Sequence, residues 1–162
     1  MPSPVGHGLG GIAAGWPLLP ERTRRAAALL ATVAIVPDLD LIVGTHRVAS
    51  HSLGAALIAG AAMFAVAKRD RLRWSSAVTL AWASHVLLDW LSNDTRPPIG
   101  IMAFWPFTHR YFKAGLEIFP AVSRKYWESR FWRYNAHALA VEVPVMGAIA
   151  LAVVWWCRRR AA

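Results

Sequence analysis

The sequence predicts an all-α protein: a membrane-embedded bundle of about four apolar helices, with residues 1–162 as a single domain. Three observations predict this fold class. Apolar residues make up 56% of the chain and the mean hydropathy is positive, which is more than one soluble domain of this size buries. Nine Trp and long runs of Ala, Leu and Val indicate a lipid bilayer as a partner. Short basic clusters separate these runs, as loops do in membrane proteins.

The net charge of +9 and the single cysteine narrow the function classes. Nucleic-acid-binding proteins usually gather basic residues on one face, whereas here they punctuate apolar segments, so no nucleic acid partner is expected. Cys157 alone forms neither a disulfide framework nor a thiolate zinc cluster. The first residues lack the basic start and the cleavage site of a signal peptide, so we expect internal segments to direct insertion.

The first three apolar segments are short or interrupted. Residues 26–44 follow a basic stretch and are broken by Pro37-Asp38-Leu39-Asp40. Residues 53–67 make about 22 Å of helix, which is short against a hydrocarbon core of about 30 Å. Residues 74–91 carry His85 and Asp89 near their end. Ionisable side chains inside such segments are costly unless they are paired or serve a function.

The fourth segment, residues 136–157, is the best candidate for a membrane span, although it contains Glu142 and Pro144. Residues 92–135, which precede it, are rich in aromatic residues, Pro and Arg. We expect a folded excursion with interfacial helices between the third and fourth segments.

Antiparallel helices joined by short loops place alternate segment ends on the same side of a bundle. One side then holds ten of the 18 basic residues, around 22–25, 68–73 and 158–160, and the opposite side holds eight, so both orientations stay open. The compact basic loops favour the cytoplasm for the first side, with the opposite side facing away from it. That opposite side collects histidines and carboxylates from four regions of the chain. They are Asp38, Asp40, His46, His51, His85, Asp89, His137 and Glu142.

These residue types suit a metal site between helices. His85 and Asp89 are four residues apart, so they project from one helical face within reach of a single ion. Pro37 turns the chain so that two carboxylates face a cavity, and Ser50 or Ser52 could cap the next helix while His51 points back at them. For His85 and Asp89, the alternative is a buried pair that is hydrogen-bonded to each other without a metal. For Asp38 and Asp40, the alternative is a solvated helix end.

His7 lies in a glycine-rich stretch that would bring the backbone close to a site, or would form a mobile terminus. His46, His109 and His137 are left open as ligands. The expected metal ligands, which should converge in one site, are His7, Asp38, Asp40, His51, His85 and Asp89.

Nitrogen and oxygen ligands without a thiolate suit zinc first, with manganese or iron as alternatives. Such an ion lowers the pKa of its bound water towards about 7 and polarises a phosphoryl or carbonyl oxygen, which is hydrolase chemistry. Arg47 and Arg110 could hold an anionic group of a substrate. Glu142 could be a ligand, a general base, or a buried acid paired with arginine. The candidate catalytic residues are Asp40, Arg47 and Glu142.

A site at the bilayer interface meets lipids most easily. We therefore expect a metal-dependent phosphoesterase that acts on a lipid or lipid-linked substrate through metal-activated water. The alternative is a non-enzymatic membrane protein, either a metal-binding scaffold or a transporter. A transporter would need polar residues that continue through the bundle to its other side. The sequence leaves the oligomeric state open.

The order of these motifs resembles the YdjM-type inner-membrane metal-dependent hydrolases over about residues 5–112. The matching motifs are His7, Pro37-Asp38-Leu39-Asp40, His46-Arg47, His51-Ser52, His85-Val-Leu-Leu-Asp89, Ile99-Gly100-Ile101-Met102 and Trp105-Pro106-Phe107. The resemblance implies a helical hydrolase in the inner membrane.

The His-x-x-x-Asp pair also resembles, more remotely, the zinc-dependent phospholipase C and single-strand nuclease superfamily, which implies phosphoester hydrolysis at a zinc cluster. The positions matching its ligands are His7, Asp38 or Asp40, His51, His85 and Asp89. That superfamily has a further His-x-x-x-Glu pair downstream, whereas His137 and Glu142 are five residues apart. The resemblance therefore does not extend to a three-metal cluster.

Overall fold

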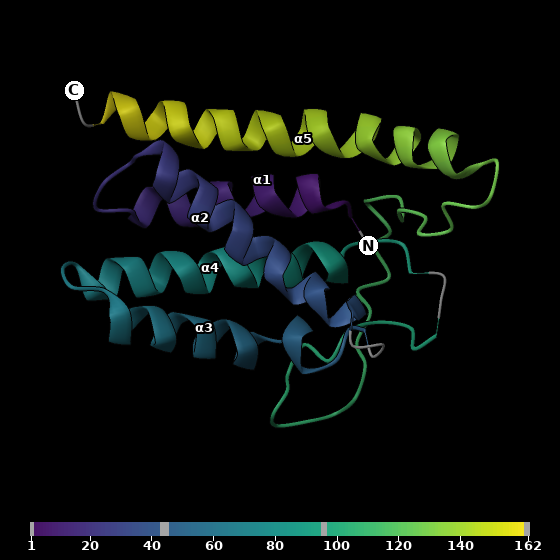
Figure 1. Ribbon diagram of the computed structural model, residues 1–162, viewed down its shortest axis with the longest axis horizontal. Helices are drawn as coiled ribbons and strands as arrows, with labels where there is room; N and C mark the ends of the chain where they lie inside the picture. Colours follow the sequence, from purple (N-terminus) through teal and green to yellow (C-terminus); the bar gives the residue numbers. More distant parts are fainter. Residues whose placement is uncertain (1, 43–45, 95–96, 161–162) are drawn as a thin grey trace.

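The computed structural model describes residues 2–42, 46–94 and 97–160 (Figure 1). Within these ranges the chain forms five α-helices and three short 3-10 helices, and its only β-type pairings are two isolated bridges. The predicted all-α class is therefore confirmed.

The chain begins with a helix that the sequence analysis did not predict, α1 (Pro4–Gly15). The Ser3 hydroxyl caps it by accepting a hydrogen bond from the Gly6 amide at 3.2 Å, and Pro4 occupies the first helical position. His7 thus lies on a helix, in the second turn after this cap.

Two glycines of α1 allow the helix to pack closely on α2 (Arg24–Ile35). A Cβ atom at Gly11 would lie 2.5 Å from the Cβ of Ala34, and one at Gly15 would lie 2.7 Å from Leu30. Glycine lowers the intrinsic stability of a helix by about 1 kcal/mol relative to alanine. The chain accepts this lower helix stability because a larger residue at Gly11 or Gly15 would prevent the close contact between α1 and α2.

The expected segment 26–44 divides into two helices. The hydroxyl of Thr23 caps α2 by accepting from the Ala26 amide at 3.1 Å, and α2 ends at Ile35, two residues before Pro37. The chain continues as a 3-10 helix, η2 (Val36–Ile42), which carries Asp38. Residues 43–44, the expected end of this segment, lie outside the described residues, as does residue 45 of the following motif.

The second and third segments match the sequence prediction closely. A 3-10 turn, η3 (Ala49–His51), leads into α3 (Leu53–Val66), where the Ser52 hydroxyl accepts from the Ala55 amide at 3.0 Å. Ser52 is therefore the cap. A short basic loop then joins α3 to α4 (Arg71–Trp90).

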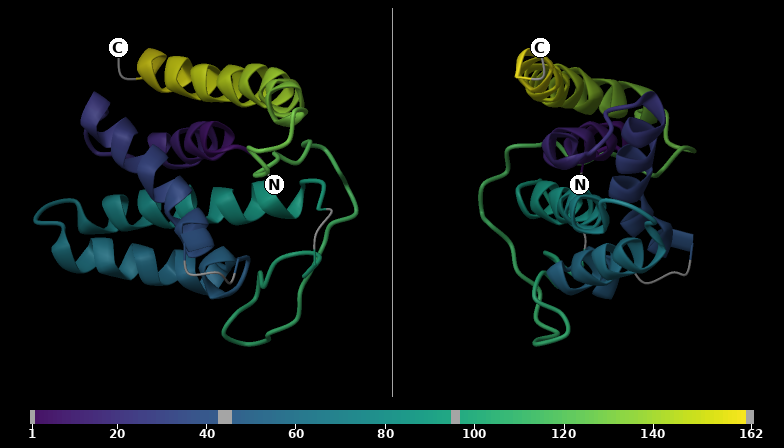
Figure 2. Two further views of the ribbon diagram at one scale, coloured as in Figure 1. Left: turned by 45° about the vertical axis from the view of Figure 1, so that its right-hand side comes forward. Right: turned by 90° about the vertical axis from the view of Figure 1, so that its left-hand side faces the viewer.

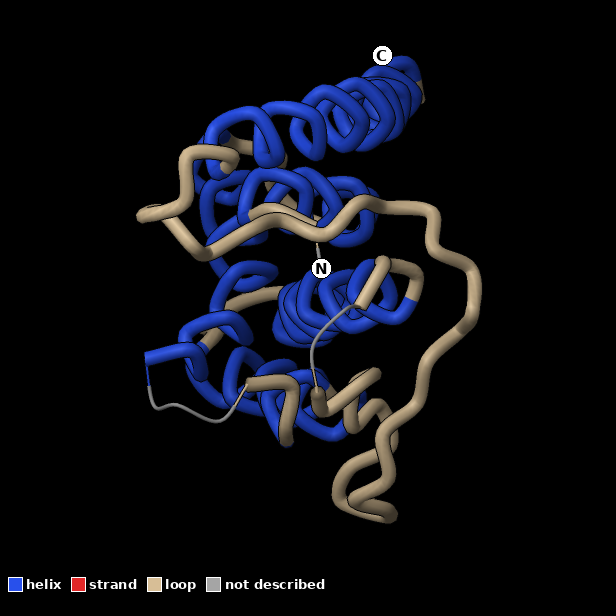
Figure 3. Tube along the Cα trace, turned by 90° about the vertical axis from the view of Figure 1, so that its right-hand side faces the viewer, coloured by secondary structure: helices blue, strands red, loops and turns tan. Residues whose placement is uncertain are grey.

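The prediction of interfacial helices between the third and fourth segments is wrong. Residues 92–94 and 97–130 form turns, bends and extended stretches, and no helix begins in these described ranges before Phe131. Backbone hydrogen bonds fix this segment instead: the Leu53 amide donates to Ala103 at 2.9 Å, and Ile101 and Phe112 exchange a pair of bonds. Its prolines and its lack of helical periodicity explain the difference. Figure 3 shows the segment running along one end of the bundle.

The last helix is α5 (Phe131–Arg159), longer than the expected 136–157. Helix α1 packs against α2, α4 and α5, while α3 packs chiefly against α4 (Figure 2). A cluster around Trp16, Leu30 and Cys157 forms the main apolar core.

One of the described helices, α5, is long and apolar enough to cross a membrane, and not four as expected. Helices α1, α2 and α3 have 12, 12 and 14 residues, or about 18 to 21 Å. Helix α4 has 20 residues, but arginines at its start and His85 and Asp89 near its end lower its hydropathy.

The residues at the two ends of the bundle, on the left and right of Figure 1, differ in chemical character. The basic end comprises residues 16–25, 67–73 and 155–160. The site end comprises residues 3–7, 36–42, 46–51, 85–94 and 131–142. This is the separation that the pairing of segment ends predicts.

Candidate metal centre

At the site end, α1, η2, η3 and α4 bring the expected histidines and carboxylates together. His7, His51 and His85 are fully buried, and the ring centroids of His7 and His85 lie 3.8 Å apart, as stacked rings. The centroids of His51 and His85 are 4.7 Å apart. The residues of this cluster are His7, Asp38, Asp40, His46, His51, His85 and Asp89.

Asp89 lies at the centre of the cluster and faces all three buried imidazoles. Its Oδ1 is 3.4 Å from Nε2 of His7, and its Oδ2 is 3.3 Å from Nε2 of His51 and 3.5 Å from Nε2 of His85. Asp38 approaches from η2, with Oδ1 3.6 Å from Nε2 of His51 and 3.8 Å from Nε2 of His85. Three Nε2 atoms therefore point at two carboxylates.

The Nδ1 atoms of His85 and His51 contact polar groups on the side of each ring away from the cluster. Nδ1 of His85 donates to the Ala34 carbonyl at 2.7 Å; because a carbonyl only accepts, this bond places the proton on Nδ1. Nδ1 of His51 lies 3.1 Å from Oδ2 of Asp40 and 3.0 Å from the Ser50 hydroxyl. In their neutral forms both rings therefore direct the Nε2 lone pair into the cluster.

The atoms that face one another in the cluster lack hydrogen bonds although they are buried. Unpartnered buried polar atoms are rare in folded proteins, since each costs about 1–3 kcal/mol. Here six of them meet in one place. They are Nε2 of His7, His51 and His85, Oδ1 of Asp38, and both carboxylate oxygens of Asp89.

Asp40 differs from the other carboxylates because hydrogen bonds already saturate it. It accepts from Nδ1 of His46 at 2.6 Å, from the Ser50 hydroxyl at 2.7 Å and from the Arg47 amide at 3.1 Å. Burial alone would raise the pKa of Asp40, but the bonds to His46, His51 and Ser50 outweigh it and hold the pKa well below its usual range. Asp40 therefore orients His46 and His51.

The buried carboxylates around His51 favour its protonated form. Burial would lower the pKa of His51, but its contacts with Asp38 and Asp40 raise it to about 9. A divalent cation between the same groups would take over the role of that proton.

Arg47 and Glu142, two of the candidate catalytic residues, have partners that the sequence analysis did not foresee. The Arg47 guanidinium pairs with Asp94, whose Oδ2 also accepts from the Gly100 amide at 2.7 Å. Oε2 of Glu142 accepts from the hydroxyl and the amide of Ser3, at 2.6 and 2.9 Å. The catalytic roles of Asp40, Arg47 and Glu142 stay predictions.

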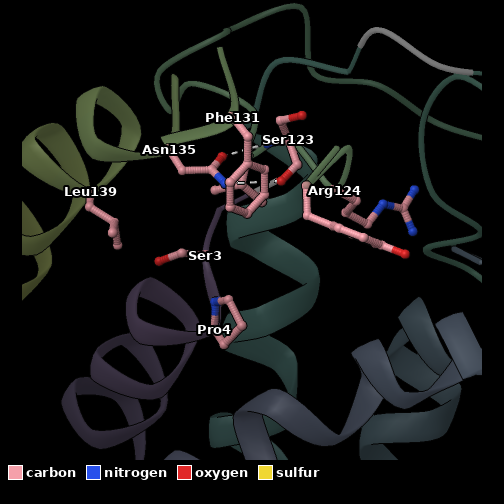
Figure 4. A pocket seen from close by; sticks show the side chains of 9 residues that line it. Ser3, Pro4, Ser123, Arg124, Phe131, Asn135 and Leu139 are labelled. Carbon is pink, nitrogen blue, oxygen red and sulfur yellow. Dashed lines mark hydrogen bonds between the residues drawn. The ribbon is translucent and has the colours of Figure 1, made fainter. Parts of the chain in front are cut away.

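Beside Ser3, a pocket of about 390 Å3 lies between the start of α1, the start of α5 and the segment before it (Figure 4). Phe131, Leu139 and Val122 give it apolar walls. Ser3 is one helical turn from His7, since the His7 amide donates to the Ser3 carbonyl at 3.0 Å. One residue that lines the pocket, Ser3, therefore lies one helical turn before His7 on the chain.

Three other candidates lie away from the cluster. His109 and Arg110 are exposed on the segment between α4 and α5, and His137 is exposed on α5. The sequence analysis missed the Ala34 carbonyl and Asp94, and it considered Ser50 only as a helix cap, not as a partner of Asp40 and His51. Of these, only Ser50 had a signal, its position beside His51.

The comparison with family models gives a match over nearly the whole chain. No curated protein and no solved structure matches the chain. The model of the family described as YdjM inner membrane protein matches residues 1–161. This match covers α1 to α5 and the whole histidine and carboxylate cluster, and it agrees with the motif resemblance. The chain therefore belongs to the YdjM inner membrane protein family.

Proposed function

We propose that this protein is a membrane-bound metal-dependent hydrolase, a phosphoesterase acting on a lipid or lipid-linked substrate. The observation that carries the proposal is the spacing of the unpartnered atoms around Asp89. Charge-assisted hydrogen bonds between nitrogen and oxygen are usually about 2.7–2.9 Å long. The contacts of Asp89 with the three histidines measure 3.3 to 3.5 Å.

That spacing fits a shared ion better than direct hydrogen bonds. Two ligands about 2.0–2.1 Å from a tetrahedral zinc ion lie about 3.3–3.4 Å apart. His7, His85 and Asp89, whose ligand atoms all lie within 4.8 Å of one another, would hold the ion and leave its fourth position to a water molecule, with Asp38 and His51 as neighbouring ligands. These nitrogen and oxygen atoms suit zinc first, with manganese or iron as alternatives. A divalent ion held there would supply Lewis acidity and lower the pKa of bound water towards about 7.

The surrounding residues have separable roles in this proposal. Asp40 and the Ala34 carbonyl fix the rings of His51 and His85, which is the usual role of the groups behind metal-binding histidines. Glu142 would accept or deliver a proton through its buried Oε1, which has no hydrogen-bond partner. Arg47, paired with Asp94, would contact the anionic group of the substrate.

A lipid substrate is supported by the apolar surfaces around the site end. The pocket beside Ser3 would receive the apolar part of such a substrate (Figure 4). Large apolar side chains are exposed near the starts of α3 and α5, among them Leu53, Leu57 and Trp132 at 43%, 64% and 79%. We propose that α4 crosses the bilayer beside α5, since its 20 residues span about 30 Å.

The orientation follows from the two ends of the bundle. Basic loops favour the cytoplasmic side of a membrane. The basic end would therefore lie in the cytoplasm, and the candidate metal centre would face away from it.

The rival is a non-enzymatic membrane protein that binds the same ion, as a scaffold or a transporter. A transporter needs polar groups from one face to the other, whereas between the cluster and the basic end lies the apolar core of Trp16, Leu30, Ala77 and Ala81. This core favours a site open to one side only.

The hydrolase and the non-enzymatic hypothesis differ in whether the metal-bound protein turns over a phosphoester. The experiment measures metal content and hydrolysis of p-nitrophenyl phosphate, bis-p-nitrophenyl phosphate and short-chain phosphatidic acid by the detergent-purified protein. His85→Ala should lose metal and activity, and His137→Ala, an exposed histidine outside the cluster, should keep both. Stoichiometric metal without turnover on any phosphoester would favour the scaffold.

A further inference from the structure

The basic end of the bundle carries a second pocket, far from the candidate metal centre. It has a volume of about 510 Å3, within the range of about 300–1,000 Å3 that is typical of ligand pockets. Leu29 of α2, Met63 and Val66 of α3 and Trp74 of α4 form its apolar walls. Lys68 and Arg69 of the α3–α4 loop line its rim.

The two rim cations are not engaged by the protein. Both are exposed, and within the described ranges neither forms a hydrogen bond or an ion pair. Their neighbours are engaged: Arg71 donates to the Ala67 carbonyl at 2.8 Å, and Arg73 donates to the carbonyls of Leu18 and Leu19 at 3.2 and 3.3 Å. Among the described residues that line the pocket there is no carboxylate, and the adjacent Asp70 makes no ion pair with either cation.

An apolar pocket with a rim of unpaired positive charge is complementary to an anionic amphiphile. For an inner membrane protein, the bilayer itself supplies an abundant ligand of this kind, anionic phospholipid. Basic pockets between helices on the cytoplasmic side bind anionic headgroups, and Trp is favoured at that depth of the bilayer. The orientation proposed from the basic loops places this pocket in that leaflet.

We propose that this pocket is a binding site for one anionic phospholipid. An acyl chain lies against Leu29, Met63 and Trp74, and the phosphate lies between Lys68 and Arg69. The site is separate from the candidate metal centre and does not depend on hydrolysis: the lipid is bound as a ligand, at the opposite end of the bundle from the cluster.

The test compares two variants with equal loss of charge. Lys68→Gln/Arg69→Gln removes the rim cations, whereas Arg24→Gln/Arg25→Gln removes two exposed cations at the same end that do not line the pocket. The full-length protein in detergent is titrated with dioleoyl phosphatidylglycerol or with zwitterionic dioleoyl phosphatidylcholine. Native mass spectrometry counts the bound lipids, and circular dichroism verifies the fold of each variant.

Wild type should retain one phosphatidylglycerol in preference to phosphatidylcholine. Each basic residue near a membrane surface contributes about a fivefold gain in affinity, so the rim variant should bind phosphatidylglycerol roughly 25-fold more weakly. The Arg24/Arg25 control should stay within about twofold of wild type. Met63→Trp, which fills the pocket without changing charge, should also displace the lipid.

The proposal is overturned if phosphatidylcholine binds as tightly as phosphatidylglycerol, or if both charge variants lose affinity equally. Equal loss would mean that the basic end attracts anionic lipid through its overall charge, with no site. Competition by inorganic phosphate alone at equal concentration would also overturn it, because the acyl chain would then contribute nothing.

Discussion

Replacing Asp89 with Asn removes the carboxylate that faces all three buried histidines. Its two oxygens lie 3.3 to 3.5 Å from three Nε2 atoms and have no hydrogen bond of their own. Asparagine keeps the size of the side chain but loses the negative charge. The expected effect is therefore on metal affinity, with little change in packing.

The size of the effect follows from the position of Asp89 relative to Asp40. Removing a group that only supports a ligand, the role proposed for Asp40, typically costs 10- to 100-fold in metal affinity. Removing a direct ligand should cost more than 100-fold. If wild type is studied at a zinc concentration of about 1,000 Kd, zinc stabilises it by about 4 kcal/mol, and a 100-fold weaker site leaves about 1.4 kcal/mol.

The assay is thermal unfolding of the detergent-purified protein with and without zinc, together with metal content after dialysis. Asp89→Asn should lose most of the zinc-induced increase in Tm, and Asp40→Asn should lose a smaller part. An Asp89→Asn protein with full metal content and an unchanged zinc-induced shift would show that the cluster is a structural network.

Four further outcomes are expected. Arg47→Ala should leave the metal content unchanged and raise KM for any phosphoester substrate, because a guanidinium does not ligate a cation; loss of metal in this variant would contradict that role. Zinc affinity should increase as the pH rises from about 6.5 towards about 9, because the metal displaces a proton from His51. The raised pKa of His51 stabilises the metal-free protein fully below about pH 6.5, and this stabilisation is lost by about pH 9. Zinc titrations at both pH values check the sign of the effect. Gly60→Ala directs a methyl group into Oγ1 of Thr79 and should lower the free energy of unfolding by about 1–3 kcal/mol, whereas Gly147→Ala meets no atom within 4 Å and should raise it by up to about 1 kcal/mol, as measured by thermal unfolding. Alkaline carbonate should leave the protein in the membrane pellet, because its exposed apolar side chains need lipid; release without detergent would refute embedding.

Local rules in the sequence predicted much of the fold. Apolar length placed α3 and α4, and Ser52 was among the expected caps. Spacing of four placed His85 and Asp89 on one face, and the pairing of segment ends brought Asp38 and His51 towards them. These features depend on periodicity and chain direction, which are readable without tertiary contacts.

The missed features depend on contacts between distant residues. Helix α1 is rich in glycine, which disfavours a helix in isolation, and it is stabilised by close packing against Leu30 and Ala34. The segment before α5 has the aromatic content of an interfacial helix, but backbone bonds to residues such as Leu53 and Leu91 fix it in an extended course. Asp94 forms an ion pair with Arg47, which is 47 residues away in the sequence, and no local sequence pattern predicts this pair.

Zinc K-edge X-ray absorption of the purified, zinc-loaded protein tests the central claim most directly, because it reports the atoms around the metal. The predicted spectrum shows nitrogen and oxygen neighbours at about 2.0–2.1 Å with imidazole scattering, and no sulfur at about 2.3 Å, since Cys157 is buried in the core near the basic end. This signal should disappear in His85→Ala. A sulfur shell, or a spectrum unchanged by His85→Ala, would contradict a metal centre built from the buried histidines and Asp89.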